Sequence, residues 1–316
     1  MDGWAQIEAP HAYLLRMMRN LAFEKLRRAK IARFEQLTLA EDFDVIDESP
    51  DAFRVISGRE QLSRLDAAQG PSRALSPRLR HAAHRGAIAA RDLLPLQGEL
   101  FHVQGMDLDA RHIWVTSVDT REHKGYIHQF DRRSGRFQRR LEITDGVRYH
   151  PGGMAMHGGS IWVPLAECKA NSSAVLVEID KNTLTVRRRI AVADHLGCVA
   201  VSGRGLVAGN WDSRLLYVFD RRGRQVRVVA NPSPTRYQDM KFEQGRLVGS
   251  GARGPRAGAI DWLAWPSLKL MDSRNTGATD RGVRYTEEGM TLKGRDLYLV
   301  PEDGPSRMFR FKLTGR

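Results

Sequence analysis

The chain has 316 residues, and its 50 Lys and Arg against 37 Asp and Glu give it a formal net charge of +13. Its 41% of hydrophobic residues can form a core, which excludes a disordered chain, and its two cysteines exclude a disulfide scaffold and zinc-finger spacing. No stretch reaches the roughly 18 apolar residues of a membrane span and the first residues lack an export signal, so the sequence indicates a cytoplasmic protein.

The N-terminal part of the chain is polarised in charge and helical in pattern. Residues 9–34 hold seven basic groups against one acidic group, whereas residues 35–66 hold nine acidic and three basic groups. Apolar residues between Leu14 and Ala22 recur every three to four positions. This spacing predicts an amphipathic helix whose opposite face is basic.

Two further changes of pattern define the predicted domains. A second short helical pattern runs through residues 53–65, and residues 69–90, rich in Ala, Arg, Pro and Gly, have the composition of a linker. Beyond the linker, short β-branched and aromatic runs alternate with turn residues. We therefore predict a helical segment over residues 1–68, a linker over 69–90 and a β domain over 91–316.

One phrase recurs five times in the β domain. It begins with Gly or Asp, continues as an alternating strand, makes a tight polar turn and ends in a second strand. The copies are GMDLDARHIWV (105–115), GMAMHGGSIWV (153–163), GCVAVSGRGLV (197–207), DMKFEQGRLV (239–248) and GMTLKGRDLYL (289–299). A second hairpin follows each of the first four copies, and the spacing of roughly 40 to 50 residues matches a four-stranded propeller blade.

The last copy leaves only three strands before the chain stops. The missing outer strand can come from DLLPLQGEL (92–100), which would close the ring by pairing the two ends of the domain. The sequence thus predicts a mainly β fold, a five-bladed β-propeller preceded by a short α-helical segment. A β-sandwich with coincidental turns is the alternative, but it does not readily give five in-phase copies with one spare strand and one missing strand.

The N-terminal helix carries a specific order of residues, PHAYLLRMMRNLAFEKLRR. This phrase resembles the later half of region 2 in extracytoplasmic-function sigma factors of the iron-citrate type, and SPDAFRVISGREQLSRLDAA resembles their bridge into region 4. The resemblance implies binding to promoter DNA and RNA polymerase, with basic residues on phosphates. The residues that it implies in nucleic-acid binding are Tyr13, Arg16, Arg19, Asn20, Arg27 and Arg28. This sequence has no counterpart of the front half of region 2 or of the helix-turn-helix of region 4. We therefore interpret the N-terminal segment as a vestigial sigma-factor fragment. It would have been joined to the propeller by a gene fusion or by a reading-frame artefact.

Five phrases carry a second resemblance, HVQGMDLDARHIWVTSVD, RYHPGGMAMHGGSIWVP, ADHLGCVAVSGRGLVAGNWDSRLLYVFD, YQDMKF and LYLVPEDGPSRMFRF. Residues 95–316 resemble a bacterial family of uncharacterised propeller proteins, related in architecture to quinoprotein-like and gluconolactonase-like propellers. The resemblance implies a fold but no reaction, so the function has to be inferred from the site. It also leaves open a periplasmic origin of the propeller.

Polar residues gather where the innermost strand of each predicted blade begins, at the top of the central channel. Three histidines occupy this place in successive blades, His102, His150 and His195. Amides, carboxylates and aromatic residues join them from the strand starts and from the loops between second and third strands. The predicted ligand-binding residues are Gln104, Asn210, Trp211, Asp212, Tyr237, Asp239 and Glu302.

Imidazoles backed by carboxylates are suitable donors for a divalent metal. The metal would activate a bound water, or a histidine beside a carboxylate would act as general base. The predicted metal ligands, which are also the predicted catalytic residues, are His102, His150, His195 and Glu288. A calcium site with oxygen ligands is an alternative, on Asn210, Asp212, Glu288 and Glu302. These groups can equally hydrogen-bond one another and water across the ring.

The leading hypothesis is a propeller that binds, and hydrolyses or isomerises, a small polar ligand at its top face. The alternatives are a sigma-related transcription initiation protein with an appended propeller, and a non-enzymatic propeller scaffold. The positive charge does not favour a nucleic-acid partner by itself, because 41 basic residues are Arg, a bias that high-GC coding produces. The basic residues of the propeller cluster in its outer hairpins, where we interpret them as a solvated surface.

Overall fold

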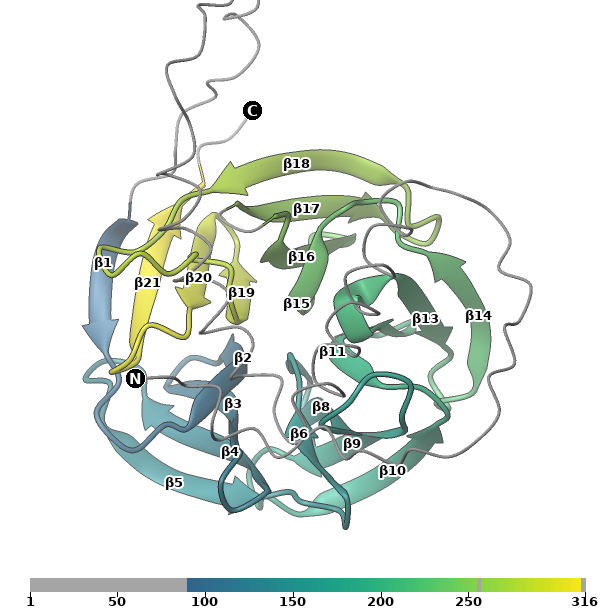
Figure 1. The fold of residues 1–316 in the computed structure, drawn as a ribbon, viewed down its shortest axis with the longest axis horizontal. Coiled ribbons are helices and arrows are strands. Elements are labelled where there is room, and N and C mark those ends of the chain that lie inside the picture. Colours follow the sequence, from purple (N-terminus) through teal and green to yellow (C-terminus); the bar gives the residue numbers. More distant parts are fainter. Residues whose placement is uncertain (1–89, 255–256, 314–316) are drawn as a thin grey trace, which may run out of the picture. The chain divides into compact units, whose positions relative to one another are not determined.

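The computed structural model describes residues 90–254 and 257–313. They form five antiparallel sheets arranged as blades around a central axis, so the prediction of a five-bladed β-propeller is confirmed (Figure 1). The predicted helical segment over residues 1–68, the nucleic-acid-binding residues within it, and the linker apart from Ala90 lie outside the described residues. Within the described residues, no helix is long and apolar enough to cross a membrane.

Each blade places its strands in order from the axis outward. Blade 1 contains β2 (His102–Leu108), β3 (His112–Asp119), β4 (Lys124–Asp131) and β5 (Phe137–Glu142). Blade 2 contains β6 (Arg148–Pro151) and β7 (Ala155–His157) as its inner strand, then β8 (Ser160–Glu167), β9 (Ala174–Asp180) and β10 (Val186–Val192). Blade 3 contains β11 (Leu196–Ser202), β12 (Gly205–Asn210), β13 (Leu215–Phe219) and β14 (Gln225–Ala230).

Blades 4 and 5 complete the ring. Blade 4 contains β15 (Arg236–Glu243), β16 (Arg246–Ala252), β17 (Gly258–Ala264) and β18 (Leu270–Thr276). Blade 5 contains β19 (Gly289–Lys293), β20 (Asp296–Val300), β21 (Arg307–Lys312) and β1 (Ala90–Pro95). The antiparallel pairing of β1 with β21 joins the two ends of the domain and confirms the predicted ring closure, although the closing strand spans Ala90–Pro95 and not the predicted residues 92–100.

The exposure of the strands follows from their distance to the axis. The second strands, such as β3 and β8, are buried along almost their whole length because a neighbouring blade covers each face of the sheet. Trp114 of blade 1, for example, packs with Ile161 and Val177 of blade 2. The outer strands β5, β10 and β14 are mostly exposed, and β5 and β10 each carry three charged residues. Charge on such edge strands opposes pairing with other chains.

Four inner strands contain a β-bulge near the top face, where the pairing register shifts by one residue. A bulge leaves one residue outside the ladder and redirects its side chain. The bulged residues are Gln104, Tyr149, Gly197 and Gln238.

The first residue of each repeated phrase lies at the narrow part of the ring, and in four blades it is glycine. A Cβ on Gly105 would lie 2.5 Å from the Cα of Gly153, and a Cβ on Gly153 would lie 2.8 Å from the Cα of Asp239. A Cβ on Gly289 would lie 2.9 Å from a backbone nitrogen of blade 1. Glycine therefore lets these strands meet, and Asp239 of blade 4 is the equivalent residue that carries a side chain.

The carboxylate of Asp239 is fully buried and joins three blades. Its Oδ2 accepts hydrogen bonds from the amides of Met106 in blade 1 and Met290 in blade 5, each at 3.0 Å. Its Oδ1 pairs with Lys241 Nζ at 2.5 Å, and Lys241 also donates to the carbonyl oxygen of Met154 in blade 2 at 2.6 Å. Burial raises the pKa of Asp239 to about 6, although Lys241 and the backbone amides favour the charged form.

Hydrogen bonds at the outer wall also connect neighbouring blades. In four places, a side chain of one blade donates to a backbone carbonyl in the outer hairpin of the next. The pairs are Gln97 with Ser134, Arg139 with Asn182, Arg188 with Arg221, and Arg227 with Pro266. These contacts are largely exposed, so we expect each to contribute little to stability compared with the buried group at the axis.

We predict that Asp239→Asn lowers the free energy of unfolding by about 3 to 5 kcal/mol, because it leaves the Lys241 ammonium buried without its carboxylate. The double variant Asp239→Asn/Lys241→Met should lose less than Asp239→Asn alone, since it removes the unpaired charge. Urea denaturation of the full chain measures these differences. Losses that simply add would show that the two side chains are not coupled.

A second prediction concerns His128, which is fully buried in blade 1 with Nε2 2.8 Å from Ser117 Oγ. Burial, with a smaller effect of Arg140, lowers the pKa of His128 to about 4. The unfolded chain takes up a proton near pH 6.5, whereas the folded chain does so only near pH 4. The stabilisation from the neutral ring is therefore complete above about pH 6.5, and about 3 kcal/mol of it is lost between pH 6.5 and 4.

The comparison with His128→Phe isolates this effect, because all other titrating groups are common to both proteins. The free energy of unfolding of the wild type should fall relative to that of the variant across this pH range. A difference that is independent of pH would contradict the burial of a neutral ring.

Candidate functional site

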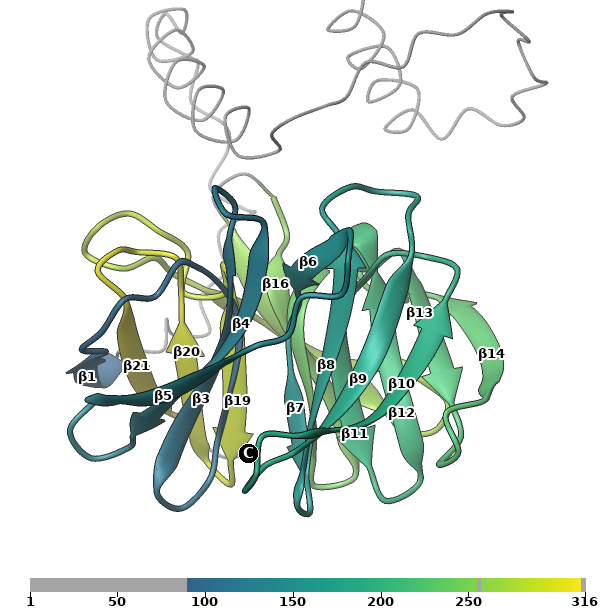
Figure 2. The same cartoon turned by 90° about the horizontal axis from the view of Figure 1, so that it is seen from below.

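The top face of the propeller is formed by the starts of the inner strands and by the loops between second and third strands. In Figure 2 this face is on the upper side, with β6 near it and β7 toward the opposite face. The predicted site residues come from these segments. The structure divides them into two groups at the top and a third group in the core.

The first group is centred on His102, the first residue of β2. Its Nδ1 lies 3.5 Å from Glu302 Oε2, and its Nε2 lies 4.0 Å from Glu288 Oε1. Glu302 also accepts the amide hydrogen of Val103 at 2.7 Å, so its carboxylate is fixed beside the ring. A carboxylate facing Nδ1 favours the tautomer that carries its proton there, which leaves Nε2 as the acceptor.

Two glutamines from the β-bulges complete this group. Gln238 Nε2 donates to Glu288 Oε2 at 3.4 Å, and Gln104 is 7% exposed. Glu288 itself is almost fully buried. The sequence places both glutamines at the top of the channel, but only Gln104 was predicted as a ligand-binding residue. Both lie two residues before the Met of their phrase, and this shared position is the signal that could have assigned Gln238 to the site.

The second group contains His150, His195 and Trp211. The rings of His150 and His195 have centroids 6.0 Å apart, and Trp211 packs edge-on against His195 at 4.6 Å. Nδ1 of His195 lies 3.0 Å from the carbonyl oxygen of Lys169, so this nitrogen carries the proton. Burial lowers the pKa of His195, and the carbonyl of Lys169 and the charge of Asp194 oppose it only in part.

Asp194 organises the loops beside His195. Its Oδ1 accepts the His195 amide at 2.8 Å, and its Oδ2 accepts hydrogen bonds from Asn210 Nδ2 at 3.1 Å and from the Tyr217 hydroxyl at 2.7 Å. Burial and the neighbouring Asp194 raise the pKa of Tyr217 to about 12. Asn210, predicted as a ligand-binding residue, therefore uses its amide to fix this loop.

The loop that carries Trp211 has an unusual backbone. Trp211–Ser213 forms a short 3-10 turn, η3, in which Asp212 and Ser213 have φ values of 62° and 50°. This left-handed region is costly for residues other than glycine. The buried Ser213 hydroxyl compensates by donating to the Tyr237 carbonyl at 2.8 Å. The turn holds Trp211 over His195.

Two predicted ligand-binding residues lie in the core and not at the top face. The Tyr237 ring is buried, and its hydroxyl donates to Asp261 at 3.0 Å. Asp239 uses both carboxylate oxygens at the axis, where it bonds Met106, Met290 and Lys241. The bulge between Tyr237 and Asp239 explains the difference, because it changes which face of the strand each side chain occupies. We therefore assign both a structural role.

The predicted metal site finds no support in the part of the chain that the structure describes. Within residues 90–254 and 257–313, no three His, Cys, Asp or Glu side chains form a group that could hold a metal ion. His102 pairs with two glutamates, whereas His150 and His195 pair with each other. The four predicted ligands are thus distributed over two groups, and the alternative calcium site is unsupported on the same ground.

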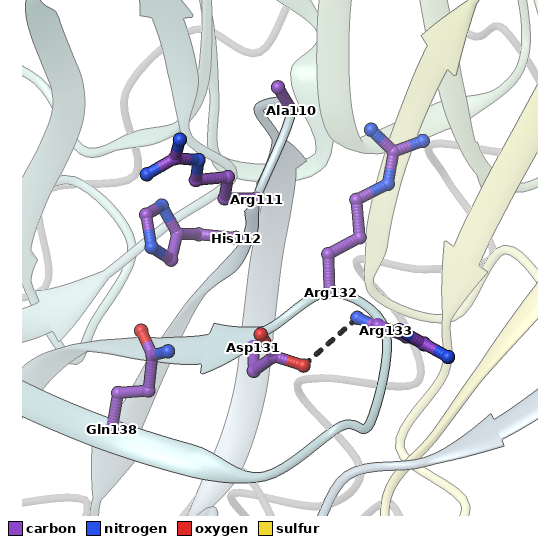
Figure 3. A pocket seen from close by; sticks show the side chains of 7 residues that line it. All are labelled: Ala110, Arg111, His112, Asp131, Arg132, Arg133 and Gln138. Atoms are coloured by element: carbon purple, nitrogen blue, oxygen red, sulfur yellow. Dashed lines mark hydrogen bonds between the residues drawn. The ribbon is translucent and has the colours of Figure 1, made fainter.

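A shallow pocket lies on the opposite face of blade 1, at the turn between β2 and β3 and the hairpin between β4 and β5. Its volume is about 630 Å³. It is lined by Ala110, Arg111, His112, Asp131, Arg132, Arg133 and Gln138 (Figure 3). Sequence reasoning did not single out this pocket, because its residues belong to two turns that come together only in the fold.

Comparisons with known proteins agree with the fold and leave the reaction open. The chain is similar over residues 92–242 to a family model described as a family of unknown function (DUF6454). No curated protein matches the sequence. The glutaminyl cyclase of Myxococcus xanthus has a similar structure, with a TM-score of 0.55 and 11% identity over 73% of this chain and 100% of that chain. The Pan2 WD40 domain of Neurospora crassa gives a TM-score of 0.43 and 10% identity over 68% and 64% of the two chains.

We predict that His195 titrates below its ordinary pKa of 6.5, because burial disfavours the imidazolium. Ring-proton NMR across a pH series measures the midpoint, and loss of the signal in His195→Gln assigns it. A midpoint at or above 6.5 would mean that the ring is solvated or paired with a carboxylate, contrary to the structure.

Proposed function

We propose that the top face binds a small polar ligand at His102, Glu288 and Glu302, and that His102 acts on the ligand as a general base. The observation that carries the proposal is the position of one imidazole between two carboxylates. Glu302 orients Nδ1, and Nε2 faces the almost fully buried Glu288. A carboxylate that orients a histidine base is a recurring arrangement in enzymes.

The charges of the group favour a particular ligand chemistry. Two carboxylates with one imidazole attract a ligand that presents N–H or O–H donors or a positive charge, such as an ammonium group. Gln104 and Gln238 add amides that can donate to or accept from a polar ligand. Trp211, on the same face, offers an apolar ring edge for the rest of the ligand.

The chemical step depends on which ring nitrogen of His102 carries the proton. With its proton on Nδ1, His102 can accept a proton at Nε2 from a water molecule, and the hydroxide so formed attacks a carbonyl carbon of the ligand. The bond from this carbon to its nitrogen or oxygen leaving group then breaks, and the imidazolium returns the proton from Nε2 to the leaving atom. If the proton comes from the ligand itself, its return to a different atom gives an isomerisation. Both steps need only a base and a carboxylate that stabilises the imidazolium.

The test uses two probes and variants of the full chain. The dipeptide Gln-Ala presents an ammonium group and an amide, and D-gluconolactone presents hydroxyl donors and an ester carbonyl. We expect at least one probe to raise the melting temperature of the wild type, because a ligand that binds only the folded state stabilises it. NMR of the same mixtures detects hydrolysis or isomerisation products.

Matched variants test whether the thermal shift comes from binding at the His102 group or from binding elsewhere on the protein. His102→Ala and Glu288→Gln should abolish the thermal shift, whereas His157→Ala, at an exposed position on the opposite face, should preserve it. Turnover, where present, should fall by about 100-fold or more in His102→Gln. Failure of both probes to shift the wild type, or an equal shift in His102→Ala, would contradict the site and favour a non-enzymatic scaffold.

A further inference from the structure

The outer hairpins of blades 1 to 3 account for most of the net positive charge of the chain. Residues 131–142, 180–192 and 220–230 together hold 13 basic and 4 acidic side chains, an excess of nine out of the net +13. The corresponding segment of blade 4, residues 264–276, holds two basic and one acidic side chain. We call the first three segments the outer basic band.

The band follows the circumference of the ring. Its strands β5, β10 and β14 are the outermost strands of three consecutive blades, as Figure 1 shows. The positively charged surface therefore curves around the outer wall and does not lie in one plane. A flat surface can touch such a curved wall along one sector only, whereas a flexible chain can follow it.

Three of the four acidic residues of the band are engaged within their own turns, and the fourth, Glu142, lies 3.4 Å from the ammonium group of Lys124. Asp131, Asp180 and Asp220 each accept hydrogen bonds from two backbone amides that follow them in the hairpin. The pKa of all three carboxyls lies below the ordinary value. The main cause is the hydrogen bond from the Ser134 hydroxyl at Asp131 and the backbone amides at Asp180 and Asp220.

Several guanidinium groups of the band have no partner within the described part of the chain. Their side chains are exposed and make no hydrogen bond or ion pair with described residues. They are Arg133, Arg136, Arg189, Arg221 and Arg222. The pocket of about 630 Å³ adjoins the band at Arg133 and adds Arg111 and His112 from the neighbouring turn (Figure 3).

We propose that the outer basic band binds the phosphodiester backbone of a single-stranded nucleic acid, with the blade 1 pocket holding one phosphate. Arginine suits this ligand because its planar guanidinium contacts phosphate oxygens in a bidentate manner. A single strand bends easily around three blades, whereas duplex DNA, with a persistence length of about 50 nm, does not. We expect this binding to be electrostatic and to depend little on nucleotide sequence, because the described outer wall has no element that reads base edges.

The experiment measures fluorescence polarisation of a labelled 20-nucleotide single-stranded RNA with the full chain over a series of salt concentrations. The band variant Arg133→Glu/Arg189→Glu/Arg222→Glu changes one exposed, unpaired arginine in each of the three blades. The control Arg204→Glu/Arg246→Glu/Arg295→Glu makes the same change of charge at exposed turns outside the band. Thermal unfolding confirms that both variants fold.

The proposal expects the band variant to bind at least about tenfold more weakly than the control. The slope of log affinity against log salt should be smaller by about 2, since each phosphate contact to a single strand contributes about 0.7. Equal affinities of the two variants, tighter binding of a 20-base-pair duplex, or binding to phosphatidylserine vesicles without binding to RNA would each overturn it.

Discussion

The buried pair of Asp239 and Lys241 is the interaction on which the ring depends. At three of the equivalent positions, Gly105, Gly153 and Gly289, a Cβ would lie too close to the backbone of a neighbouring blade, and at the equivalent position blade 4 carries the buried carboxylate of Asp239. Asp239 accepts amides from blades 1 and 5, and Lys241 donates to a carbonyl of blade 2. Blade 3 is linked to blade 2 by hydrogen bonds between Gly153 and the backbone of Gly197 and Val199.

A buried ion pair is weak evidence for net stability, since its desolvation cost is large. We infer that the main role of this pair is to position the inner strands relative to one another. The pair makes hydrogen bonds to the inner strands of blades 1, 2 and 5, and these bonds fix how the three strands lie against the inner strand of blade 4. Asp107, farther along β2, repeats the principle by accepting hydrogen bonds from Met156 of blade 2 and Thr291 of blade 5.

This central group also determines where ligand chemistry can occur. It occupies the narrow part of the ring, so the polar side chains above it face the top of the propeller. The β-bulges at Gln104 and Gln238 lie near the top face, and Gln238 donates a hydrogen bond to Glu288 of the His102 group. The candidate site and the outer basic band then use different parts of the fold, one at the axis and the other on the wall.

The sequence predicted the blades well because their signals are local. The alternation of each phrase and its tight turn identify a hairpin without reference to the rest of the chain, and the spare strand of residues 92–100 follows from counting strands. The residues of the top face were predicted less well. Tyr237 and Asp239 were expected there, but a one-residue bulge places them in the core. The partner of Asp239, Lys241, was also missed, although the sequence shows two opposite charges two residues apart at the start of the only phrase that does not begin with glycine.

The central claim is that Asp239 closes the axis and joins blades 1, 4 and 5. Native-state hydrogen exchange at the amides of Met106 and Met290 tests it most directly, because both donate to this carboxylate. If the claim holds, these two amides exchange only through global unfolding, as slowly as amides in the buried second strands. Exchange at the rate of amides in exposed loops would show that the carboxylate does not hold the inner strands together.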